Sequence, residues 1–586
     1  MNDESIEKII YNAQLFQFPL VYKGLDISIR SFFDCKIAAH LLDPDLSDDN
    51  LELDKIFSKY NISVKVNEYD NLGVVSNSIN YLHGELKALL ELEALLRQKL
   101  QSFQMINCLK GIEMPLSSLL TKMELLGITM DVENFEKINS QADKLIKSIT
   151  TEARALIDQN IATGFNLSSP EQVAQVLYET LQLPTPPPKP KQRHFSTGEE
   201  ELSLIKHLHP IVPMILNHRT VAKIKSTYID PYRNFIKGTQ TTVHSIFNQT
   251  STRTGRLSSC KPNMQQIPNE ITITIENENV SSSSTVSRSD DHLRNLQLQL
   301  GLPIDNDFKS QAMPVKYEFV LRSVFVARKG SVLISADYSQ IEMRVFAAAC
   351  HDTKLKAVFD NKGDIYTILA SLLFKKNIEL ITEDERKKAK VICIGQVYGM
   401  SPDMAAQKLQ ISVGEAQKVY DSFFNTFRSV KDWSSQQISR AYNDGYVKTI
   451  SGRRRYLPDI RSSEFHARSA ACRQAVNTII QGSAADILKL AMILIDDSFK
   501  SLLKNGYSND SIPSLLLQVH DELIYEVHIP DIDSMTMPEI MVKCEPYINI
   551  IKNCMEKRVR ENWKIPVPLI ANITCGLNWG EMNEYK

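Results

Sequence analysis

Residues 332–342 read VLISADYSQIE. The run starts after Gly330 with short, apolar residues, which predicts a buried strand that delivers Asp337 to its end. A second run, residues 515–527, reads LLLQVHDELIYEV and is apolar on both sides of an acidic centre. This pattern predicts a β-hairpin whose turn carries the acids, beginning with Asp521. Both runs therefore place carboxylates where a strand ends.

Three acids of these two runs are candidates for metal binding: Asp337, Asp521 and Glu522. Carboxylates are costly beside an apolar core unless a cation is near, and Mg²⁺ takes carboxylate oxygens together with substrate phosphate. Two such ions about 3.5 to 4 Å apart stabilise the attacking and the leaving oxygen of an in-line displacement, which growth of a nucleic-acid strand requires. For each run taken alone, the alternative is a solvated acidic turn.

The segment between the two runs supports phosphate chemistry. Residues 386–399 read RKKAKVICIGQVYG, and every fourth position forms one stripe on a helix: Arg386, Lys390, Ile394 and Tyr398. The first half of this stripe is cationic and suits a triphosphate, whereas the second half is apolar or aromatic and suits a base pair. The alternative is a solvated basic helix face, because acids precede the stripe as they do at many helix N-termini.

A second set of polar residues repeats the four-residue spacing further along the chain. Arg473, Asn477 and Gln481 would share one face of a helix. Their side chains donate and accept hydrogen bonds, as contacts to a minor groove or to a template strand must.

These motifs resemble, in the same order along the chain, those of the A family of DNA polymerases. Residues 337–344 (DYSQIEMR) and 518–522 (QVHDE) resemble its two palm motifs, and residues 386–399 resemble its fingers helix. Residues 254–259 (TGRLSS) and 262–268 (PNMQQIP) resemble the stretch that follows the primer-template minor groove. Several ordered motifs make a chance match far less probable than one motif does.

The resemblance implies an α/β (α+β) fold of the right-hand polymerase type, preceded by a partial, inactive exonuclease-like domain. Two domains are expected: an exonuclease-like domain at residues 1–107 and a polymerase domain at residues 108–586. Within the polymerase domain, the thumb would cover about 108–265 including the loop 184–194, followed by an insert at about 269–317. The palm would cover about 318–350 and 451–586, and the fingers about 351–450. Helices are expected over residues 119–148, 169–181, 405–427, 430–443, 484–503 and 538–563.

The resemblance also implies residue roles. Asp337 and Asp521 would bind two Mg²⁺ ions, for which Mn²⁺ is a possible substitute, and Glu522 would lie beside the primer end. Lys390 would protonate the leaving pyrophosphate, and Glu342 would exclude a ribose 2′-hydroxyl. The expected nucleotide-binding residues are Arg386, Lys390, Ile394, Tyr398, Glu342, Gln340, Tyr338 and Tyr366. The expected DNA-binding residues are Arg256, Asn263, Gln265, Arg473, Asn477, Gln481, His520, Arg453 and Arg454.

Three positions depart from the family pattern. Ile394 stands where an aromatic residue usually faces the nucleotide, and an aliphatic side chain cannot stack on a base. Tyr366 replaces a histidine that usually follows the Asp-Ile pair, and Cys472 stands where an acid usually precedes Arg473. We therefore expect altered nucleotide binding from the first two departures and altered positioning of Arg473 from the third.

The N-terminal part resembles the inert exonuclease remnant of the nu and theta polymerases. This similarity covers residues 33–45, where Asp34, Asp43 and Asp45 are interpreted as solvated helix caps, so proofreading is not expected. The insert at about 269–317 and residues 218–227 favour the nu over the theta subgroup.

The chain has 586 residues, of which 43% are hydrophobic, and this is enough to form the core of a large enzyme. The formal net charge is only −2, so DNA affinity must come from local basic patches such as Arg453 and Arg454. Nine cysteines without a C-x-x-C pair favour reduced thiols, and no signal, transit or membrane segment is recognised. A nuclear, monomeric protein that contacts no membrane is expected.

The sequence therefore predicts template-directed DNA synthesis from deoxynucleoside triphosphates (dNTPs) on primer-template DNA. It would proceed without proofreading, in repair or translesion synthesis, alongside DNA repair proteins. Two alternatives stay open: a catalytically weak or inactive scaffold that binds primer ends or repair proteins, and an organellar replicative polymerase.

Overall fold

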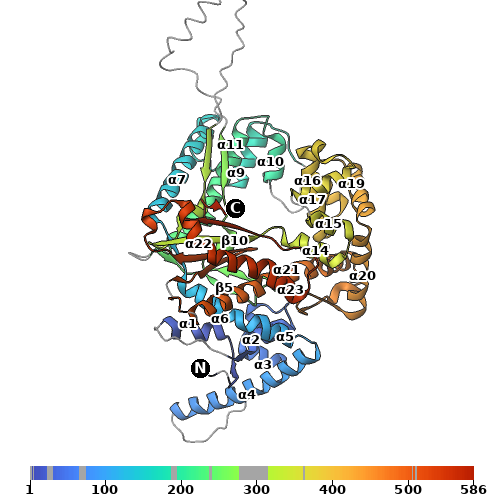
Figure 1. Cartoon of the computed structure of the whole chain (residues 1–586). Helices are drawn as coiled ribbons and strands as arrows, with labels where there is room; N and C mark the ends of the chain where they lie inside the picture. The colour runs from blue at the N-terminus through green and yellow to red at the C-terminus, as the bar shows by residue number, and fades with distance from the viewer. Residues whose placement is uncertain are drawn as a thin grey trace, which may run out of the picture. The chain divides into compact units, whose positions relative to one another are not determined.

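The computed structural model describes residues 3, 5–22, 31–64, 74–186, 194–236, 241–275, 315–360, 363–504, 506–508 and 511–585 (Figure 1). The chain divides into two compact units. Unit 1 consists of Met1–Thr129, Thr242–Gln266 and Val326–Lys586, and unit 2 of Met130–Thr241 and Ile267–Phe325. Most of the predicted insert at 269–317 and of the loop at 184–194 lies outside the described residues.

A five-stranded antiparallel sheet forms the centre of unit 1. Its strand order is β13 (Ser514–Val519), β14 (Glu522–His528), β10 (Ser331–Tyr338), β15 (Ala571–Gly576) and β16 (Asn583–Glu584). β10 is buried at every position except Asp337, and the register places Asp337 opposite Glu522 of β14. The predicted strand and the predicted acidic hairpin are therefore both confirmed.

One long helix, α21 (Phe465–Lys504), supplies much of the core of unit 1. It begins well before the predicted residue 484, and its buried side chains concentrate between Ala471 and Phe499. In the part of the chain that the structure describes, α21 alone has the length and apolar composition needed to cross a membrane, but 83% of its most apolar stretch is buried inside the protein. Such burial is typical of a core helix.

A group of helices follows β10 and lies on one side of unit 1, drawn in yellow to orange in Figure 1. They are α14 (Ile341–Cys350), α15 (Thr353–Asp360), α16 (Ile365–Phe374), α17 (Glu383–Val397), α18 (Pro402–Leu409), α19 (Val413–Thr426) and α20 (Arg428–Asp444). A capping box of Thr382 and Glu385 starts α17. The single helix predicted over 405–427 is wrong, because Gln410 ends α18 in a left-handed conformation and Ser412 caps α19.

The N-terminal part of unit 1 is mostly helical. It contains β1 (Lys8–Ile10) paired with β2 (Phe32–Asp34), and helices α1 (Ala13–Tyr22), α2 (Cys35–Leu42), α3 (Leu53–Lys59), α4 (Val74–Ser102), α5 (Ile106–Cys108) and α6 (Met114–Leu126). Asp34 caps α2 as predicted, but it is buried rather than solvated. Its carboxylate accepts backbone N–H groups at Asn12, Ala13, Lys36 and Ile37.

The helix predicted over 119–148 is wrong because Gly127 ends α6. Gly127 has φ of +59°, and a Cβ there would lie 2.6 Å from the carbonyl oxygen of Val243. A short strand, β3 (Ile128–Met130), follows before α7 (Val132–Ala155) begins behind its cap Asp131.

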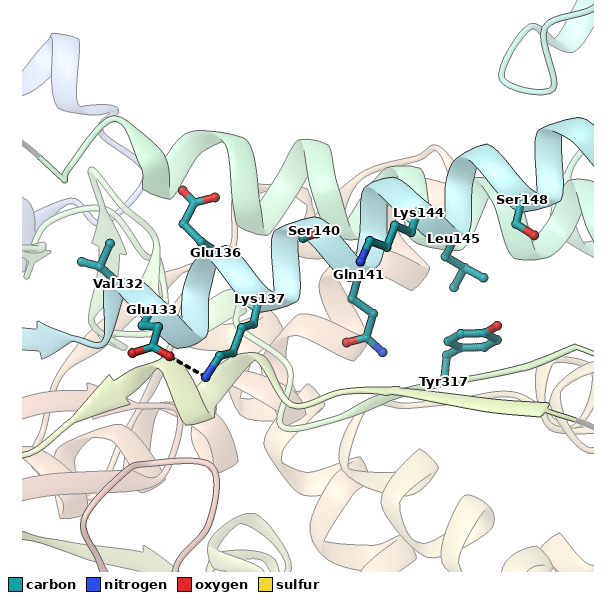
Figure 2. A pocket seen from close by; sticks show the side chains of 10 residues that line it. All are labelled: Val132, Glu133, Glu136, Lys137, Ser140, Gln141, Lys144, Leu145, Ser148 and Tyr317. Atoms are coloured by element: carbon teal, nitrogen blue, oxygen red, sulfur yellow. Dashed lines mark ion pairs between the residues drawn. The ribbon is translucent and has the colours of Figure 1, made fainter.

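Unit 2 is built on α7 and α11 (Ile211–Ile224). Its other helices are α8 (Gln159–Ala162), α9 (Pro170–Ala174), α10 (Glu199–Ile205) and α12 (Asp230–Arg233), and its strands β7 (Ile271–Ile275) and β8 (Val315–Phe319) pair antiparallel. α9 continues as a π-helical turn to Thr180, which confirms the helix predicted over 169–181. An open cavity of about 1090 Å³ runs along α7 and is faced by Tyr317 of β8 (Figure 2). None of the predicted site residues lines this cavity.

Glu124 of α6 makes the stability of unit 1 depend on pH. Its side chain accepts the Phe247 N–H at 2.7 Å and the Gln14 amide at 2.5 Å. Burial nevertheless raises the pKa of Glu124 to about 7, because the charged carboxylate is poorly solvated. The folded state therefore favours the protonated acid. This contribution to stability is complete below the unfolded pKa of about 4.3 and is lost as pH rises towards 7.

We expect Glu124→Gln to be more stable than the wild type at pH 8, by up to about 3 kcal/mol, and about equally stable at pH 4. Urea unfolding at both pH values measures the difference. Glu91→Gln, at an exposed position of α4, is the matched control and should show no such pH dependence. Equal stability of Glu124→Gln and wild type at pH 8 would contradict this account.

Candidate active site

Three carboxylates gather at one edge of the central sheet. Asp337 stands near the end of β10 and is exposed, and Glu522 is its direct neighbour on β14. The backbone N–H of Tyr338 donates to the carbonyl oxygen of Asp521 at 3.2 Å, so the hairpin turn lies against the end of β10. The structure thus brings together the acids that the sequence analysis singled out.

The surroundings of these acids differ. Glu522 accepts hydrogen bonds from the Ser335 hydroxyl at 2.5 Å and from the Trp579 indole at 3.3 Å. Burial raises the pKa of Asp521 to about 6, while Arg256 opposes this rise and the Glu342 carboxylate adds to it. A charged Asp521 is therefore disfavoured until a cation comes near.

Asp337 and Asp521 fit a site for Mg²⁺. Within the described residues, no group of three or more His, Cys, Asp or Glu side chains is arranged to hold a metal ion. Mg²⁺ in sites that bind nucleotides uses one or two carboxylates and takes its other ligands from phosphate and water. An exposed Asp337 beside a partly desolvated Asp521 is consistent with such a site.

A network of charged and polar side chains connects this edge to α17. Glu342, in the first turn of α14, accepts hydrogen bonds from the Arg256 guanidinium and from the Tyr398 hydroxyl, the latter at 2.7 Å. Tyr398 is the C-cap of α17, and Gln481 of α21 also bonds to its phenol. Arg256 and Glu342 are also close enough to Asp521 to shift its pKa, so this network lies next to the acids at the end of β10.

The cationic half of the stripe on α17 lies against α16. Arg386 donates to both carboxylate oxygens of Asp364, from Nε at 2.7 Å and from Nη2 at 3.1 Å, and from Nη1 to Glu383 at 3.0 Å. The ammonium of Lys390 lies 5.4 Å from the ring centroid of Tyr366. Asp364 and Glu383 are not among the site residues predicted from the sequence.

The polar ladder of α21 lies near the end of α17. A Cβ at Gly399, where φ is +64°, would lie 2.7 Å from Cγ of Arg473, so the arginine packs directly against this glycine. Asn477 has a buried Oδ1 without a hydrogen-bond partner among the described residues. A buried amide oxygen of this kind is available to an incoming donor.

The predicted minor-groove segment lies beside the acidic hairpin. The side-chain amide of Gln265 donates to Oε1 of Gln518 at 2.8 Å, and Oδ1 of Asn263 accepts the Gln265 N–H at 3.1 Å. Gln518 in turn donates to the carbonyl oxygen of His520, whose own side chain is exposed. The contacts join two motifs that are far apart in the sequence.

Two predicted nucleotide contacts next to Asp337 are placed differently from the expectation. The Tyr338 side chain is 3% exposed and donates its hydroxyl to the Met555 carbonyl at 2.7 Å, so the phenol lies in the core, and a nucleotide contact by Tyr338 stays a prediction. Gln340 is the N-cap of α14, with φ of +52°, and its Oε1 is buried without a partner among the described residues.

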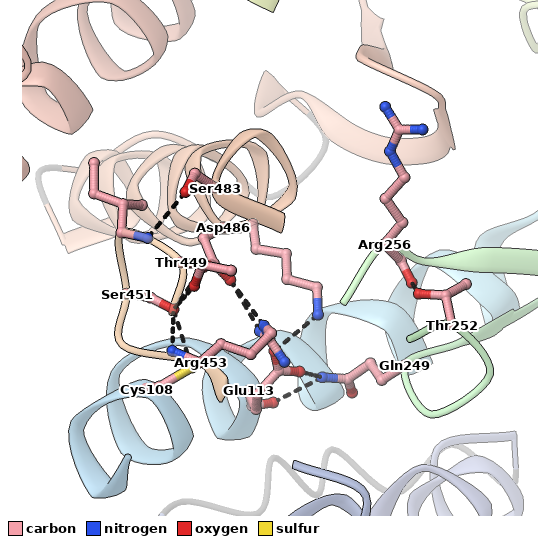
Figure 3. A network of polar contacts seen from close by, with 12 residues as sticks. Cys108, Glu113, Gln249, Thr252, Arg256, Thr449, Ser451, Arg453, Ser483 and Asp486 are labelled. Carbon is pink, nitrogen blue, oxygen red and sulfur yellow. Dashed lines mark hydrogen bonds and ion pairs between the residues drawn. The ribbon is translucent and has the colours of Figure 1, made fainter. Parts of the chain in front are cut away.

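The side chains of Arg453 and Arg454, predicted to contact DNA, are buried rather than exposed, and Figure 3 shows the network around Arg453. The Arg453 side chain is 6% exposed and donates to the carboxylates of Glu113 and Asp486, the latter at 2.9 Å. Lys489 joins the same network through Glu113 at 2.8 Å. Burial alone would raise the pKa of Glu113, but the nearby cations Lys489 and Arg453 lower it to about 2.

The Arg454 guanidinium is buried between aromatic rings, 5.0 Å from the centroid of Phe103 and 4.2 Å from that of Tyr446. The signal missed in the sequence is the pair Asp486 and Lys489 inside an otherwise apolar stretch of α21. Buried charges of that kind require partners elsewhere in the chain.

Several known proteins are similar to this chain. The family model described as DNA polymerase family A matches residues 132–581. DNA polymerase I of Borreliella burgdorferi is 31% identical over 588 residues, covering 99% of this chain and 56% of that protein. DNA polymerase I of Streptococcus pneumoniae is 32% identical over 582 residues, covering 98% of this chain and 58% of that protein. The chain thus spans a little over half the length of these curated relatives.

A solved structure is similar over the whole chain. It is described as the POL domain of Pol1 from M. smegmatis in complex with DNA primer-template and dNTP. The TM-score is 0.77 at 28% sequence identity, and the match covers 99% of this chain and 87% of that one. This similarity confirms the predicted α/β polymerase fold. The prediction of a nuclear protein is wrong, because these relatives are proteins of bacteria, which have no nucleus.

Proposed function

The chain belongs to DNA polymerase family A, and on that premise we propose that it adds deoxynucleotides to a primer 3′ end as a template strand directs. The observation that carries the proposal is that Asp337, at the end of β10, and Asp521, in the turn that precedes β14, lie at the same end of two neighbouring strands. The same edge is connected through Glu342 and Tyr398 to the helix that carries Arg386 and Lys390. Primer-template DNA and dNTPs, both present in the similar solved structure, are the proposed partners.

In the proposed reaction the primer 3′ hydroxyl loses its proton to water, its oxygen forms a bond to the α-phosphorus of the dNTP, and the bond from that phosphorus to the bridging oxygen of pyrophosphate breaks. Two Mg²⁺ ions held by Asp337 and Asp521 would stabilise charge on the attacking and leaving oxygens. Arg386 binds and orients the triphosphate through its guanidinium. Lys390, whose side chain is exposed, donates a proton to the leaving pyrophosphate.

Synthesis without proofreading is part of the proposal. The acids of the N-terminal part have structural partners: Asp34 accepts backbone N–H groups, Asp43 pairs with Lys59, and Asp45 pairs with Arg253. Roles in repair or translesion synthesis, a monomeric state and contacts with repair proteins are further parts of the proposal. Assignment to the nu subgroup stays a prediction, and the relatives described above are bacterial DNA polymerases I.

Extension of a labelled primer on a template with Mg²⁺ and four dNTPs tests the proposed function. Extended products support polymerisation. Binding of primer-template without any extension, with Mg²⁺ or with Mn²⁺, would contradict it and favour the scaffold. Removal of a mismatched 3′ nucleotide by the purified chain would contradict the absence of proofreading.

Ile394→Tyr should strengthen nucleotide binding. Ile394 is half-buried on α17, one turn after Lys390, and a tyrosine there can stack on the incoming base. Base stacking on an aromatic ring is worth about 1 to 3 kcal/mol, so we expect KM for the dNTP to fall by about fivefold or more. Single-nucleotide kinetics on undamaged and abasic templates measure the effect. An unchanged KM on both templates would show that position 394 does not face the nucleotide.

A further inference from the structure

The Arg386 guanidinium meets its two carboxylate partners along different edges. A guanidinium carries five N–H donors in a fixed plane. Asp364 receives the edge made by Nε and Nη2, at 2.7 and 3.1 Å, which is a bidentate contact. Glu383 receives only Nη1, at 3.0 Å. The outer edge of the guanidinium, made by Nη1 and the second hydrogen of Nη2, is therefore the one that a phosphate can take.

Asp364 is itself firmly held. It is the N-cap of α16, and its Oδ2 accepts the backbone N–H of Thr367 at 2.8 Å and the Thr367 hydroxyl at 2.5 Å. The N-terminus of a helix also favours a negative charge. The hydrogen bond from Arg386, followed by those from Thr367, holds the pKa of Asp364 at about 2. This carboxylate is therefore a fixed, charged partner for Arg386.

Glu383 is held much less firmly. It is the first residue of α17, three positions before Arg386, and its side chain is 80% exposed. Exposed ion pairs of this spacing contribute little to stability and are screened by salt. A polyanion that approaches Arg386 would replace this carboxylate at small cost.

We infer that Asp364 is a positioning residue that holds Arg386 with its outer edge towards the triphosphate, and that Glu383 occupies this edge until a nucleotide displaces it. The inference rests on the proposed function and deepens it. The first turn of α16 then supports both cations proposed to bind the triphosphate, Arg386 and Lys390, because Tyr366, two residues after Asp364, lies against Lys390. Tyrosine at this position thus acts as a neutral surface beneath a cation rather than as a phosphate ligand.

The inference predicts opposite outcomes for two similar substitutions. Asp364→Asn keeps a side-chain oxygen that can cap α16 but loses the charged carboxylate that accepts two hydrogen bonds from Arg386. We expect KM for the dNTP to rise about tenfold, with kcat within about twofold of the wild type and an unchanged Kd for primer-template. Glu383→Gln removes the displaceable partner, so KM should fall or stay within about twofold of the wild type.

The experiment combines steady-state single-nucleotide incorporation with equilibrium titration of dATP and Mg²⁺ into the intact chain. Asp403→Asn, an exposed acid in the first turn of α18, is the matched control and should change neither readout. A loss of dATP affinity in Asp364→Asn but not in Glu383→Gln supports the inference, even if no variant extends a primer and the proposed function fails. An unchanged or improved affinity in Asp364→Asn, an equal loss in both variants, or no dATP binding by the wild type would overturn it.

Discussion

Asp521→Ala should reduce primer extension by at least about 10³-fold while primer-template affinity stays within a few-fold of the wild type. Asp521 lies in the turn against β10, next to Asp337, and its carboxylate is one of the two groups proposed to hold Mg²⁺. Without it the ions would lose a ligand that stabilises charge on the reacting oxygens. The duplex contacts predicted on α21 and in residues 254–268 are left in place, so the loss should appear in kcat rather than in DNA binding.

Single-turnover extension with saturating Mg²⁺ measures this effect, and a filter-binding or anisotropy titration measures DNA affinity. Asp533→Ala, an exposed acid that follows the same hairpin, is the matched control and should extend primers at the wild-type rate. Extension by Asp521→Ala within tenfold of the wild type would show that this acid does not hold a catalytic ion.

Arg453→Met should lower the free energy of unfolding by about 3 to 5 kcal/mol. The substitution removes the cation that lies between Glu113 and Asp486 and leaves two buried carboxylates with Lys489 as their remaining cation. Arg453 also supports the turn before Arg256, because a Cβ at Gly255 would lie 2.6 Å from Nε of Arg453. The network therefore stabilises the segment that carries a predicted DNA contact.

Urea unfolding at pH 7 measures the loss, with Arg440→Met on the exposed face of α20 as the matched control. Adding Asp486→Asn to Arg453→Met should recover part of the stability, because one uncompensated charge is then removed. If Arg453→Met lowers the free energy of unfolding by less than about 1 kcal/mol, Arg453 contributes no more than a surface ion pair does, and this would contradict the buried network.

The central strand and the acidic hairpin were predictable because their information is local. Apolar runs that end in acids predict strands with carboxylates at their ends, and β10 and the β13–β14 hairpin are confirmed. The register of Asp337 opposite Glu522 joins β10 to β14, which are far apart in the sequence, so the hairpin alone does not determine it. The helix boundaries at Gly127 and Gln410 were missed because each lies between two stretches whose apolar spacing predicts helix, and each interruption begins at a residue with positive φ.

The partners of the buried and paired charged residues could not be predicted from local sequence patterns. A run of arginines at 453–455 has the pattern of a basic surface patch, but Arg453 pairs with a glutamate 340 positions away. The Arg386–Asp364 pair spans 22 positions and two helices, so the sequence pattern of α17 showed the cation without its partner. Tyr338 follows a catalytic candidate directly, yet strand alternation turns its side chain into the core. The two ion pairs depend on tertiary contacts that spacing alone does not contain.

The most direct test of the central claim is single-nucleotide incorporation by the wild-type chain on four primer-templates that differ only in the first template base. The account predicts that, with Mg²⁺, each template directs preferential addition of the complementary deoxynucleotide. Addition of the same nucleotide on all four templates, or binding of the duplexes with no addition to any of them, would contradict template-directed synthesis by this chain.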